Sequence, residues 1–389
     1  MDKFDFDQII ERQGTGAEKW DGRENIFGSE DLLPMWVADM DFASPPEVVT
    51  ALTARAAHGI YGYPLRGDGF YQAAIDWLKR RHGWNVNRDW INSAPGVVSA
   101  ISIALQAFTS PGDKVLIQPP VYPGFFSAVQ KSGRNLVLNP LRQEGRRYVI
   151  DFADLEAKLA SGVKLFVLCS PHNPVGRVWT KEELVTLGEL CLKHGTLVVA
   201  DEIHSDLVFL RKRHIPFASL SPEFAAIAVT CVSPSKTFNV AGLATALTVI
   251  AESRMRARYE SVLKAMHVEE CNIFGITALE AAYRHGEAWL DSLLIYLETN
   301  ADFLVSFLRQ RNCGIEVEKP EATYLAWLDC RSLGLKGANL PEFFASKAKV
   351  GLSDGRRFGE QGFMRLNFAC PRALLEEGLE RIEAAIKLK

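Results

Sequence analysis

The sequence predicts an α/β protein whose larger part is a mostly parallel sheet covered by helices on both faces. From about Pro45 onward, short and fully apolar runs alternate with helical patterns. Strands without polar alternation are typical of parallel sheets that are buried on both sides. The runs expected to be strands are Lys114–Gln118, Lys164–Ser170, Thr196–Ala200, Ala226–Ser233 and Thr245–Ile250. The intervening helices are expected at Pro46–His58, Phe70–Arg81, Val97–Phe108, Pro123–Ser132 and Lys181–His194.

A smaller α/β unit is predicted at the C-terminal end of the chain. Two long helical patterns, Glu252–Met266 and Glu287–Arg311, precede it. Strand, helix, strand and helix then follow at Tyr324–Asp329, Pro341–Lys349, Gly362–Phe368 and Arg372–Ile386. We expect an N-terminal segment (1–45) that packs on a small domain (287–389), and a large domain between them (46–286).

The composition is that of an ordinary globular protein. Of the 389 residues, 48% are hydrophobic and 23% charged, and the net charge is −3. This balance gives no electrostatic reason to expect nucleic acid or a membrane surface as a partner. No apolar run reaches the roughly 18–20 residues of a membrane span, and the acidic start is unlike a signal peptide. Seven cysteines without metal spacing predict a cytoplasmic protein with no metal site.

One predicted strand ends in hydroxyl groups and a lysine, in the order Ser233-Pro234-Ser235-Lys236-Thr237. A lysine in this position can form a Schiff base, and neighbouring hydroxyls can bind a phosphate. The alternative is a surface loop with an incidental lysine, which the segment alone does not exclude.

A carboxylate follows another predicted strand. Asp201 lies directly after an apolar run, so it is expected at the carboxyl end of the strand. An acid there can keep a pyridinium nitrogen protonated, although it can also cap a turn. The next residue, Glu202, is expected to be structural. His204 either approaches a cofactor or makes structural hydrogen bonds.

Three further strand ends carry candidate binding residues. Asn173 lies in a turn fixed by prolines and a glycine, so its amide can donate to a cofactor oxygen. Gly96 opens an apolar helix whose free N–H groups suit a phosphate. Tyr122 can stack on a planar ring. The alternatives are a rigid turn for Asn173, a simple helix cap for Gly96 and a core tyrosine for Tyr122.

The C-terminal unit contributes an arginine within an apolar strand, Met364-Arg365-Leu366-Asn367. A buried charge requires a partner, and a substrate α-carboxylate is a suitable bidentate one. A structural salt bridge is the alternative. Taken together, the six motifs predict an enzyme that holds pyridoxal 5'-phosphate (PLP) on Lys236 and acts on the Cα–H bond of an amino acid.

The same residues, in this order, resemble the fold-type-I PLP enzymes of the aspartate-aminotransferase superfamily. The resemblance covers nearly the whole chain. Within the superfamily, the chain resembles most specifically the PatB/MalY-type cystathionine β-lyases, or C–S lyases. The stretches that carry it are Pro34–Phe42, Pro95–Val98, Asp201–Leu207 and Pro234–Leu243.

The resemblance implies catalytic roles for three residues. Lys236 would form the internal aldimine, Asp201 would face the pyridine nitrogen and Tyr122 would stack on the ring. Asn173 would meet the phenolic oxygen close to the substrate, and Arg365 would bind the substrate carboxylate.

The resemblance also implies how the phosphate is held and how the chain assembles. The phosphate would contact Gly96, Val97, Ser233 and Ser235. The family works as homodimers with shared active sites, and Tyr61 matches the tyrosine that reaches the neighbouring phosphate.

Two departures from aminotransferases favour a lyase. Many aminotransferases have tyrosine three residues after the aspartate and arginine eight residues after the lysine, where this chain has His204 and Ala244. The predicted reaction is α,β-elimination of cystathionine or related cysteine S-conjugates to a thiol, pyruvate and ammonia. A PLP-dependent aminotransferase and a regulatory or binding protein with the same fold remain alternatives.

The substrate pocket is expected to involve the segments Trp36–Phe42 and Val350–Phe363. Within the first of them, Asp39 and Asp41 can line the mouth of the pocket, but they are expected to be solvated or capping residues. No residue that selects a second substrate carboxylate can be named from the sequence.

Overall fold

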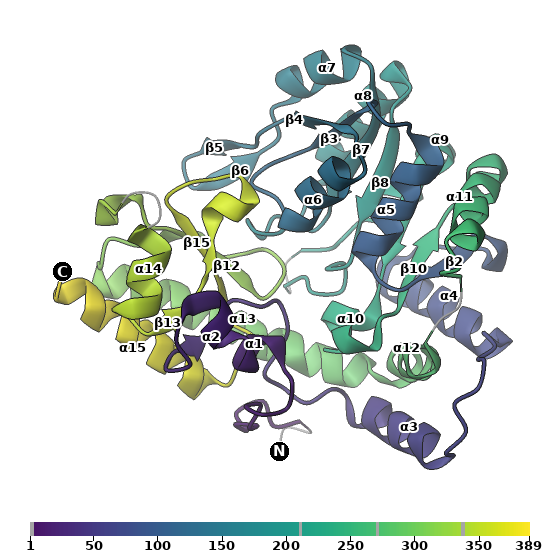
Figure 1. Ribbon diagram of the computed structural model, residues 1–389. Coiled ribbons are helices and arrows are strands. Elements are labelled where there is room, and N and C mark those ends of the chain that lie inside the picture. Colours follow the sequence, from purple (N-terminus) through teal and green to yellow (C-terminus); the bar gives the residue numbers. More distant parts are fainter. Residues whose placement is uncertain (1–3, 210–211, 270–271, 336–338) are drawn as a thin grey trace.

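A computed structural model describes residues 4–209, 212–269, 272–335 and 339–389 (Figure 1). Its central sheet has seven strands in the order β2–β10–β9–β8–β7–β3–β4. All strands run parallel except β10, which is antiparallel to both neighbours. The predicted α/β class with a mostly parallel sheet is therefore confirmed. The strands are β2 (Ile91–Ala94), β3 (Lys114–Ile117), β4 (Asn135–Leu138), β7 (Val163–Cys169), β8 (Leu197–Asp201), β9 (Ala228–Val232) and β10 (Ala246–Val249).

Helices cover both faces of this sheet because successive residues of the inner strands alternate between two apolar layers. In β7, Leu165 and Val167 belong to one hydrophobic cluster, whereas Phe166 and Leu168 belong to the other. The first layer is completed by α5 (Val97–Phe108), α6 (Pro123–Lys131) and α11 (Ser253–Ala265). The second includes α4 (Asp68–His82), α7 (Phe152–Ala160), α8 (Lys181–His194), α9 (Pro222–Ala226) and α12 (Ile273–His285).

The C-terminal part forms a second, antiparallel sheet of four strands in the order β11–β12–β15–β14. The N-terminal segment joins this part, because β1 (Leu33–Pro34) pairs with β13 (Val350–Gly351). The domain boundaries at residues 45 and 286 stay a prediction. The other elements here are β11 (Glu316–Val317), β12 (Leu325–Asp329), β14 (Ser353–Asp354), β15 (Phe363–Asn367), α1 (Glu18–Asp21), α2 (Arg23–Phe27), α13 (Glu287–Arg311), α14 (Asn339–Ser346) and α15 (Arg372–Lys387).

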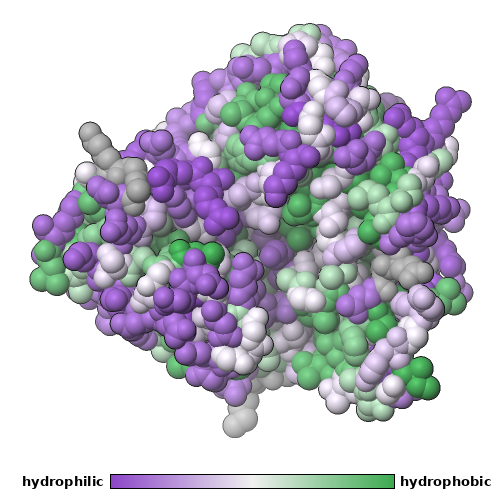
Figure 2. All heavy atoms as spheres, viewed as in Figure 1, coloured by the Kyte–Doolittle hydropathy of each residue, from purple (hydrophilic) through white to green (hydrophobic). Residues whose placement is uncertain are grey.

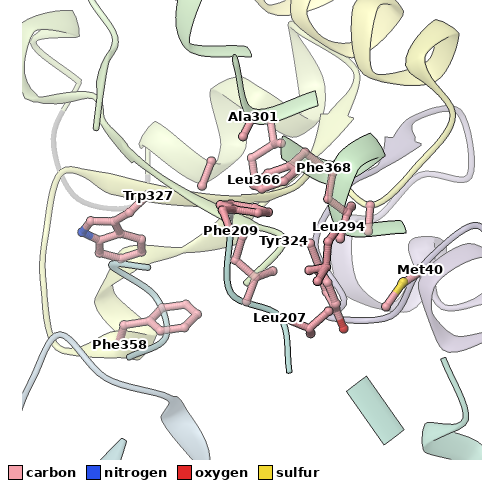
Figure 3. Packing of buried hydrophobic residues seen from close by; sticks show 14 of the residues in the cluster. Met40, Leu207, Phe209, Leu294, Ala301, Tyr324, Trp327, Phe358, Leu366 and Phe368 are labelled. Atoms are coloured by element: carbon pink, nitrogen blue, oxygen red, sulfur yellow. The ribbon is translucent and has the colours of Figure 1, made fainter. Parts of the chain in front are cut away.

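One hydrophobic cluster connects the two sheets. Figure 3 shows Tyr324 and Phe368 of the C-terminal part beside Leu207 and Leu294, with Met40 of the N-terminal segment close by. Burial of such large side chains contributes roughly 1.5–3 kcal/mol each. The N-terminal segment and both sheets are therefore held around one common core.

Several elements were not expected from the sequence. Helix α12 contains a glycine, which weakens the helical pattern in the sequence. A Cβ on Gly275 would overlap Thr245 Oγ1, so close packing explains the presence of glycine at this position. Strand β2 is short and half polar. Also unexpected are α7 and the hairpin of β5 (Arg142–Glu144) and β6 (Arg147–Val149). The remaining helices are α3 (Pro46–Ala57) and α10 (Pro234–Thr237).

The described residues contain neither a membrane-spanning helix nor a cluster of metal ligands. None of their helices has the length and apolar character needed to cross a membrane. None of their side chains forms a group of three or more His, Cys, Asp or Glu residues suited to a metal ion.

Candidate active site

The predicted site residues lie at one edge of the central sheet. Strands β7, β8 and β9 are in register, with Cys169 beside Asp201 and Asp201 beside Cys231. The turn that contains Asn173 and the turn that begins at Ser233 therefore leave the sheet on either side of Asp201. This is the edge at which α/β proteins bind ligands.

Gly96 lies at the same edge, at the start of α5. Because β10 runs antiparallel, its first residue, Ala246, pairs with the last residue of β2, Ala94, and β10 also borders the end of β9. Gly96 is the N-cap of α5, and a Cβ there would meet nothing within 4 Å. Open space before a twelve-residue helix suits a phosphate. Val97, the first helical residue, is buried.

The two serines before Lys236 shape its turn. The Ser233 hydroxyl donates to Thr245 O at 2.7 Å and accepts from Ser235 N at 3.1 Å, so it caps the short helix α10. Ser235 is half-buried. The first serine thus fixes the backbone that presents Ser235 and Lys236, and contact of both with phosphate stays a prediction.

Lys236 is half-buried and lines the cleft. Its Nζ donates to Ala38 O at 2.7 Å, and the hydroxyl of Tyr324 donates to the same oxygen at 2.9 Å. Burial, together with the positive charge of Arg365, lowers the pKa of Lys236 to about 8. A substantial fraction of the amine is therefore neutral, and hence nucleophilic, near neutral pH.

Asp201 is a buried acid without an ion pair among the described residues. Its Oδ1 accepts from Ile203 N at 3.1 Å. No cationic side chain of the described residues lies within ion-pair distance of it. Burial and the nearby charge of Glu202 raise the pKa of Asp201 to about 7. A protonated ring nitrogen would supply the missing positive charge.

The neighbours of Asp201 have different roles. Glu202 accepts from His214 Nε2 at 2.9 Å and from Phe217 N at 2.8 Å, which confirms its expected structural character. His204 is buried, and its Nδ1 has no hydrogen-bond partner among the described residues. Burial and the charges of Lys236 and Arg365 lower the pKa of His204 to about 3. His204 is therefore a neutral ring near the amine, not a hydrogen-bonded structural histidine.

Arg365 lies on β15 and points a buried guanidinium at the cleft. It donates to Asn173 Oδ1 at 3.2 Å and to Trp36 O at 2.9 Å, and it lies over the Phe358 ring at 4.8 Å. Its Nε has no partner, and no carboxylate of the described residues is within ion-pair distance. Burial lowers the pKa of Arg365 to about 10. The structure thus shows no structural salt bridge and leaves this cation available for a ligand carboxylate.

The cleft has a volume of about 1020 Å³ and includes Tyr122, Lys236 and Arg365 in its lining. Both segments that were expected to form the pocket contribute, the first through Trp36–Phe42 and the second through Ser353, Arg357 and Phe358. Burial, followed by the charge of Asp201, raises the pKa of Tyr122. Figure 2 shows the molecular surface hollowed between the small-sheet part and the large-sheet part.

The expectation that Asp39 and Asp41 are solvated or capping residues is wrong. Arg12 contacts both, with 2.6 Å to Asp39 Oδ2 and 2.6 Å to Asp41 Oδ1, and the buried Lys19 Nζ lies 2.5 Å from Asp41 Oδ2. The Lys19 charge and hydrogen bond outweigh burial and lower the pKa of Asp41. All four residues belong to the N-terminal segment, so their contacts hold that segment folded on itself where Arg12, Asp39 and Asp41 line the cleft.

Asn239 lies in the stretch Pro234–Leu243 that carries the resemblance, but its role could not be read from the sequence. Its Nδ2 donates to Met40 O at 3.0 Å and Phe42 O at 2.8 Å, while Oδ1 accepts from Met40 N at 3.0 Å. Its backbone is left-handed, with φ of 58°, which asparagine tolerates better than most residues. Asn239 therefore fastens the lysine loop to the N-terminal segment.

Tyr61 does not line the cleft of its own chain. Its hydroxyl donates to Ala56 O at 2.6 Å, its ring lies 5.7 Å from that of Phe274, and the side chain is exposed. Its expected contact with the phosphate of a second copy stays a prediction.

The described residues fit PLP at three points. A reactive amine at Lys236 matches the aldehyde, a buried acid at Asp201 matches the ring nitrogen, and open space at Gly96 matches the phosphate. Asp201 and Arg365 have no ion-pair partners among the described residues, so a protonated ring nitrogen and a substrate carboxylate would complement their charges.

Comparisons with known proteins agree with this fit. A family model described as aminotransferase class I and II matches residues 30–382. Cystathionine β-lyase PatB of Bacillus subtilis is 48% identical over 386 residues, covering 98% of this chain and 100% of PatB. Protein MalY of Escherichia coli is 35% identical, covering 99% of both chains. The PLP-containing crystal structure of cystalysin from Treponema denticola has a TM-score of 0.96 at 34% identity, covering 99% of this chain and 100% of that chain. The predicted resemblance is confirmed, and the chain belongs to the aminotransferase class I and II family, in the group that contains PatB and MalY.

Proposed function

We propose that the protein is a PLP-dependent carbon–sulfur lyase that acts on cystathionine or related cysteine S-conjugates. The observation that carries this proposal is the amine of Lys236, whose lowered pKa reflects burial and the charge of Arg365. Neither Arg365 nor the nearby acid Asp201 has an ion-pair partner among the described residues. Relatives named cystathionine β-lyase support the choice of a lyase over an aminotransferase.

Three residues divide the work of the first step. When bound, PLP supplies an electron sink that stabilises negative charge at Cα. Arg365 binds the α-carboxylate and so fixes the amino acid with its Cα–H bond toward Lys236. The neutral amine of Lys236 then removes the Cα proton as a general base. Asp201 holds a negative charge where the ring nitrogen needs one.

Bond cleavage then conserves all atoms and charges. The electron pair of the Cβ–S bond leaves with sulfur, which takes up a proton to become the free thiol. The remaining three-carbon fragment is hydrolysed by one water molecule to pyruvate and ammonia. An aminotransferase would instead need a keto acid to complete each cycle.

Incubation with cystathionine alone distinguishes the candidate functions. We expect pyruvate to accumulate over many turnovers without an added keto acid. A single turnover that resumes only after a keto acid is added would identify an aminotransferase. Absence of turnover in protein that carries bound cofactor would identify a binding protein.

Loss of the Arg365 charge is expected to weaken substrate use strongly. Arg365→Gln should lower kcat/KM for cystathionine by about 100-fold, because removal of one partner of a buried charged pair costs roughly 2–5 kcal/mol. Arg365→Lys should recover part of the loss. Steady-state pyruvate assays check this, with the exposed Arg356→Gln as a control. Equal activities of Arg365→Gln and wild type would remove Arg365 from the site.

We also propose that the protein works as a homodimer in the cytoplasm. The loop after α3 exposes Ile60, Tyr61, Tyr63 and Leu65, an apolar run that is costly to leave in water. Figure 2 shows hydrophobic atoms gathered in the region where α3 lies. The six cysteines in the described residues are free, which fits a reducing compartment.

A mixing experiment tests whether the dimer shares its active sites. Lys236→Ala and Tyr61→Ala chains should each be weakly active, whereas a mixture refolded together should regain up to about a quarter of wild-type activity. The regained activity comes from mixed dimers, in which one site has both native residues. Recovery no greater than the sum of the separate variants would contradict shared sites.

A further inference from the structure

Seven charged side chains among the described residues line the cleft: Arg12, Glu18, Asp39, Asp41, Lys236, Arg357 and Arg365. Three of them form a neutralising cluster with the buried Lys19. Lys236 and Arg365 already have roles in the proposed reaction. Two charges of opposite sign, Glu18 and Arg357, are left without an assigned partner.

Arg357 is an exposed cation next to the α-carboxylate site. It lies in the turn Gly355–Phe358 and makes no hydrogen bond or ion pair with another described residue. The same turn supplies Phe358, whose ring faces the Arg365 guanidinium at 4.8 Å. The charge of Arg357 acts on both Tyr122 and Arg365. Arg357 therefore lies close to, but separate from, the group that binds the reacting end of the substrate.

Glu18 supplies the matching negative charge. It is the first residue of α1, its side chain is exposed, and no cation of the described residues lies within ion-pair distance. Its charge also acts on Tyr122, with the opposite sign to that of Arg357. Both charges therefore act on one tyrosine and line the same cleft, and they form no ion pair with each other.

We propose that Arg357 and Glu18 form a subsite for the charged end of the leaving thiol. Arg357 binds a carboxylate and Glu18 binds an ammonium group, so the pair matches a zwitterionic amino acid. The preferred substrates are cysteine S-conjugates whose leaving thiol is itself an amino acid, as in cystathionine. This inference rests on the proposed lyase function and adds the substrate class to it.

Four thioethers separate the two charges of the subsite. Cystathionine carries both charges on its leaving thiol, S-(2-carboxyethyl)cysteine only the carboxylate, S-(2-aminoethyl)cysteine only the ammonium, and S-ethylcysteine neither. Pyruvate release by the holoenzyme gives kcat/KM for each. For each protein variant, the kcat/KM of every charged thioether is divided by the kcat/KM of S-ethylcysteine. This quotient is the ratio of that thioether.

Arg357→Gln should lower the cystathionine ratio and the carboxyethyl ratio about tenfold, the size expected for a charged hydrogen bond. It should leave the aminoethyl ratio unchanged or raise it. Glu18→Gln should lower the cystathionine ratio and the aminoethyl ratio, but not the carboxyethyl ratio. Arg357→Lys, which keeps the charge, should recover part of the loss.

Two neighbouring residues provide matched controls. Arg356 is also exposed but pairs with Asp354 at 2.6 Å and does not line the cleft. Glu24 in α2 is an exposed acid that likewise does not line the cleft. Arg356→Gln and Glu24→Gln should leave all ratios unchanged.

The outcomes separate this inference from the function on which it rests. Pyruvate from all four substrates, with ratios that Arg357→Gln and Glu18→Gln do not change, would overturn the subsite and keep the lyase. Equal loss in the Arg356→Gln control would also overturn it. Absence of pyruvate from every substrate with the wild-type holoenzyme would overturn the lyase function itself.

Discussion

Lys236→Ala is expected to reduce pyruvate formation from cystathionine by about four orders of magnitude, since it removes a general base as well as the group that holds the cofactor. The structure explains why this lysine is suited to both tasks. Burial and Arg365 lower its pKa to about 8, and a single hydrogen bond to Ala38 O holds its Nζ in the cleft.

The control for this variant is an exposed lysine. Lys193 forms a surface pair with Glu156, and such pairs contribute roughly 0–1 kcal/mol. Lys193→Ala should keep wild-type activity and absorbance of the bound cofactor. Pyruvate formation and absorbance of the bound cofactor are measured for wild type, Lys236→Ala and Lys193→Ala. A Lys236→Ala protein that turns over cystathionine at more than about a tenth of the wild-type rate would contradict a general-base role.

Asp201→Asn is expected to have two effects of opposite sign. Activity should fall by about 10²- to 10³-fold, because the charge that would stabilise a protonated ring nitrogen is lost. The cofactor-free protein, in contrast, should become more stable at pH 8 by on the order of 2–4 kcal/mol. Burial raises the pKa of Asp201 from 3.8 to about 7, so an ionised Asp201 is a cost to the folded state.

The pH dependence follows from the direction of this change. Between the unfolded pKa of 3.8 and the folded pKa of about 7, the folded protein binds more protons at Asp201 than the unfolded chain does. The contribution of Asp201 to stability therefore falls as pH rises through this window. Denaturant unfolding of cofactor-free wild type and Asp201→Asn should give stabilities that diverge from pH 4 to pH 8 and agree near pH 4.

Asp206, on the same loop as Asp201, is a control because its pKa changes in the opposite direction. It accepts hydrogen bonds from Thr237 Oγ1 at 2.9 Å and from Trp77 Nε1 at 3.2 Å, and it lies 2.8 Å from His82 Nε2. The His82 contacts outweigh burial and lower the pKa of Asp206. Asp206→Asn should therefore destabilise the protein at pH 8, by about 3 kcal/mol. A destabilised Asp201→Asn protein would contradict the account of Asp201.

The sequence was sufficient to place the residues that follow strands. Asp201 and Lys236 come directly after apolar runs, and parallel strands end at one edge, so their proximity could be inferred. Arg365 was identified by a different signal, a charge within an apolar strand. The predicted helices α8 and α13 have the expected bounds.

Contacts between distant segments could not be inferred in this way. The cluster of Arg12 with Asp39 and Asp41 depends on how the N-terminal segment folds back over the cleft. The hydrogen bonds of Asn239 to residues 40 and 42 join segments almost 200 positions apart. No local pattern encodes such pairs, because each residue type is also common at ordinary surfaces.

The absence of partners was equally hidden from the sequence. An arginine in an apolar strand predicts a buried pair, and only the structure shows that Arg365 lacks an acid among the described residues. Likewise, no sequence pattern singles out Glu18 and Arg357, and only the structure shows that both line one cleft with Tyr122.

The attachment of the cofactor can be measured directly. Holoenzyme treated with borohydride, digested and examined by mass spectrometry should carry the pyridoxyl phosphate mass on the peptide that contains Lys236. The mass should be missing from Lys236→Ala protein treated in the same way. A label on any other lysine of the wild-type chain, or no label on protein that forms pyruvate, would contradict the assignment of this residue.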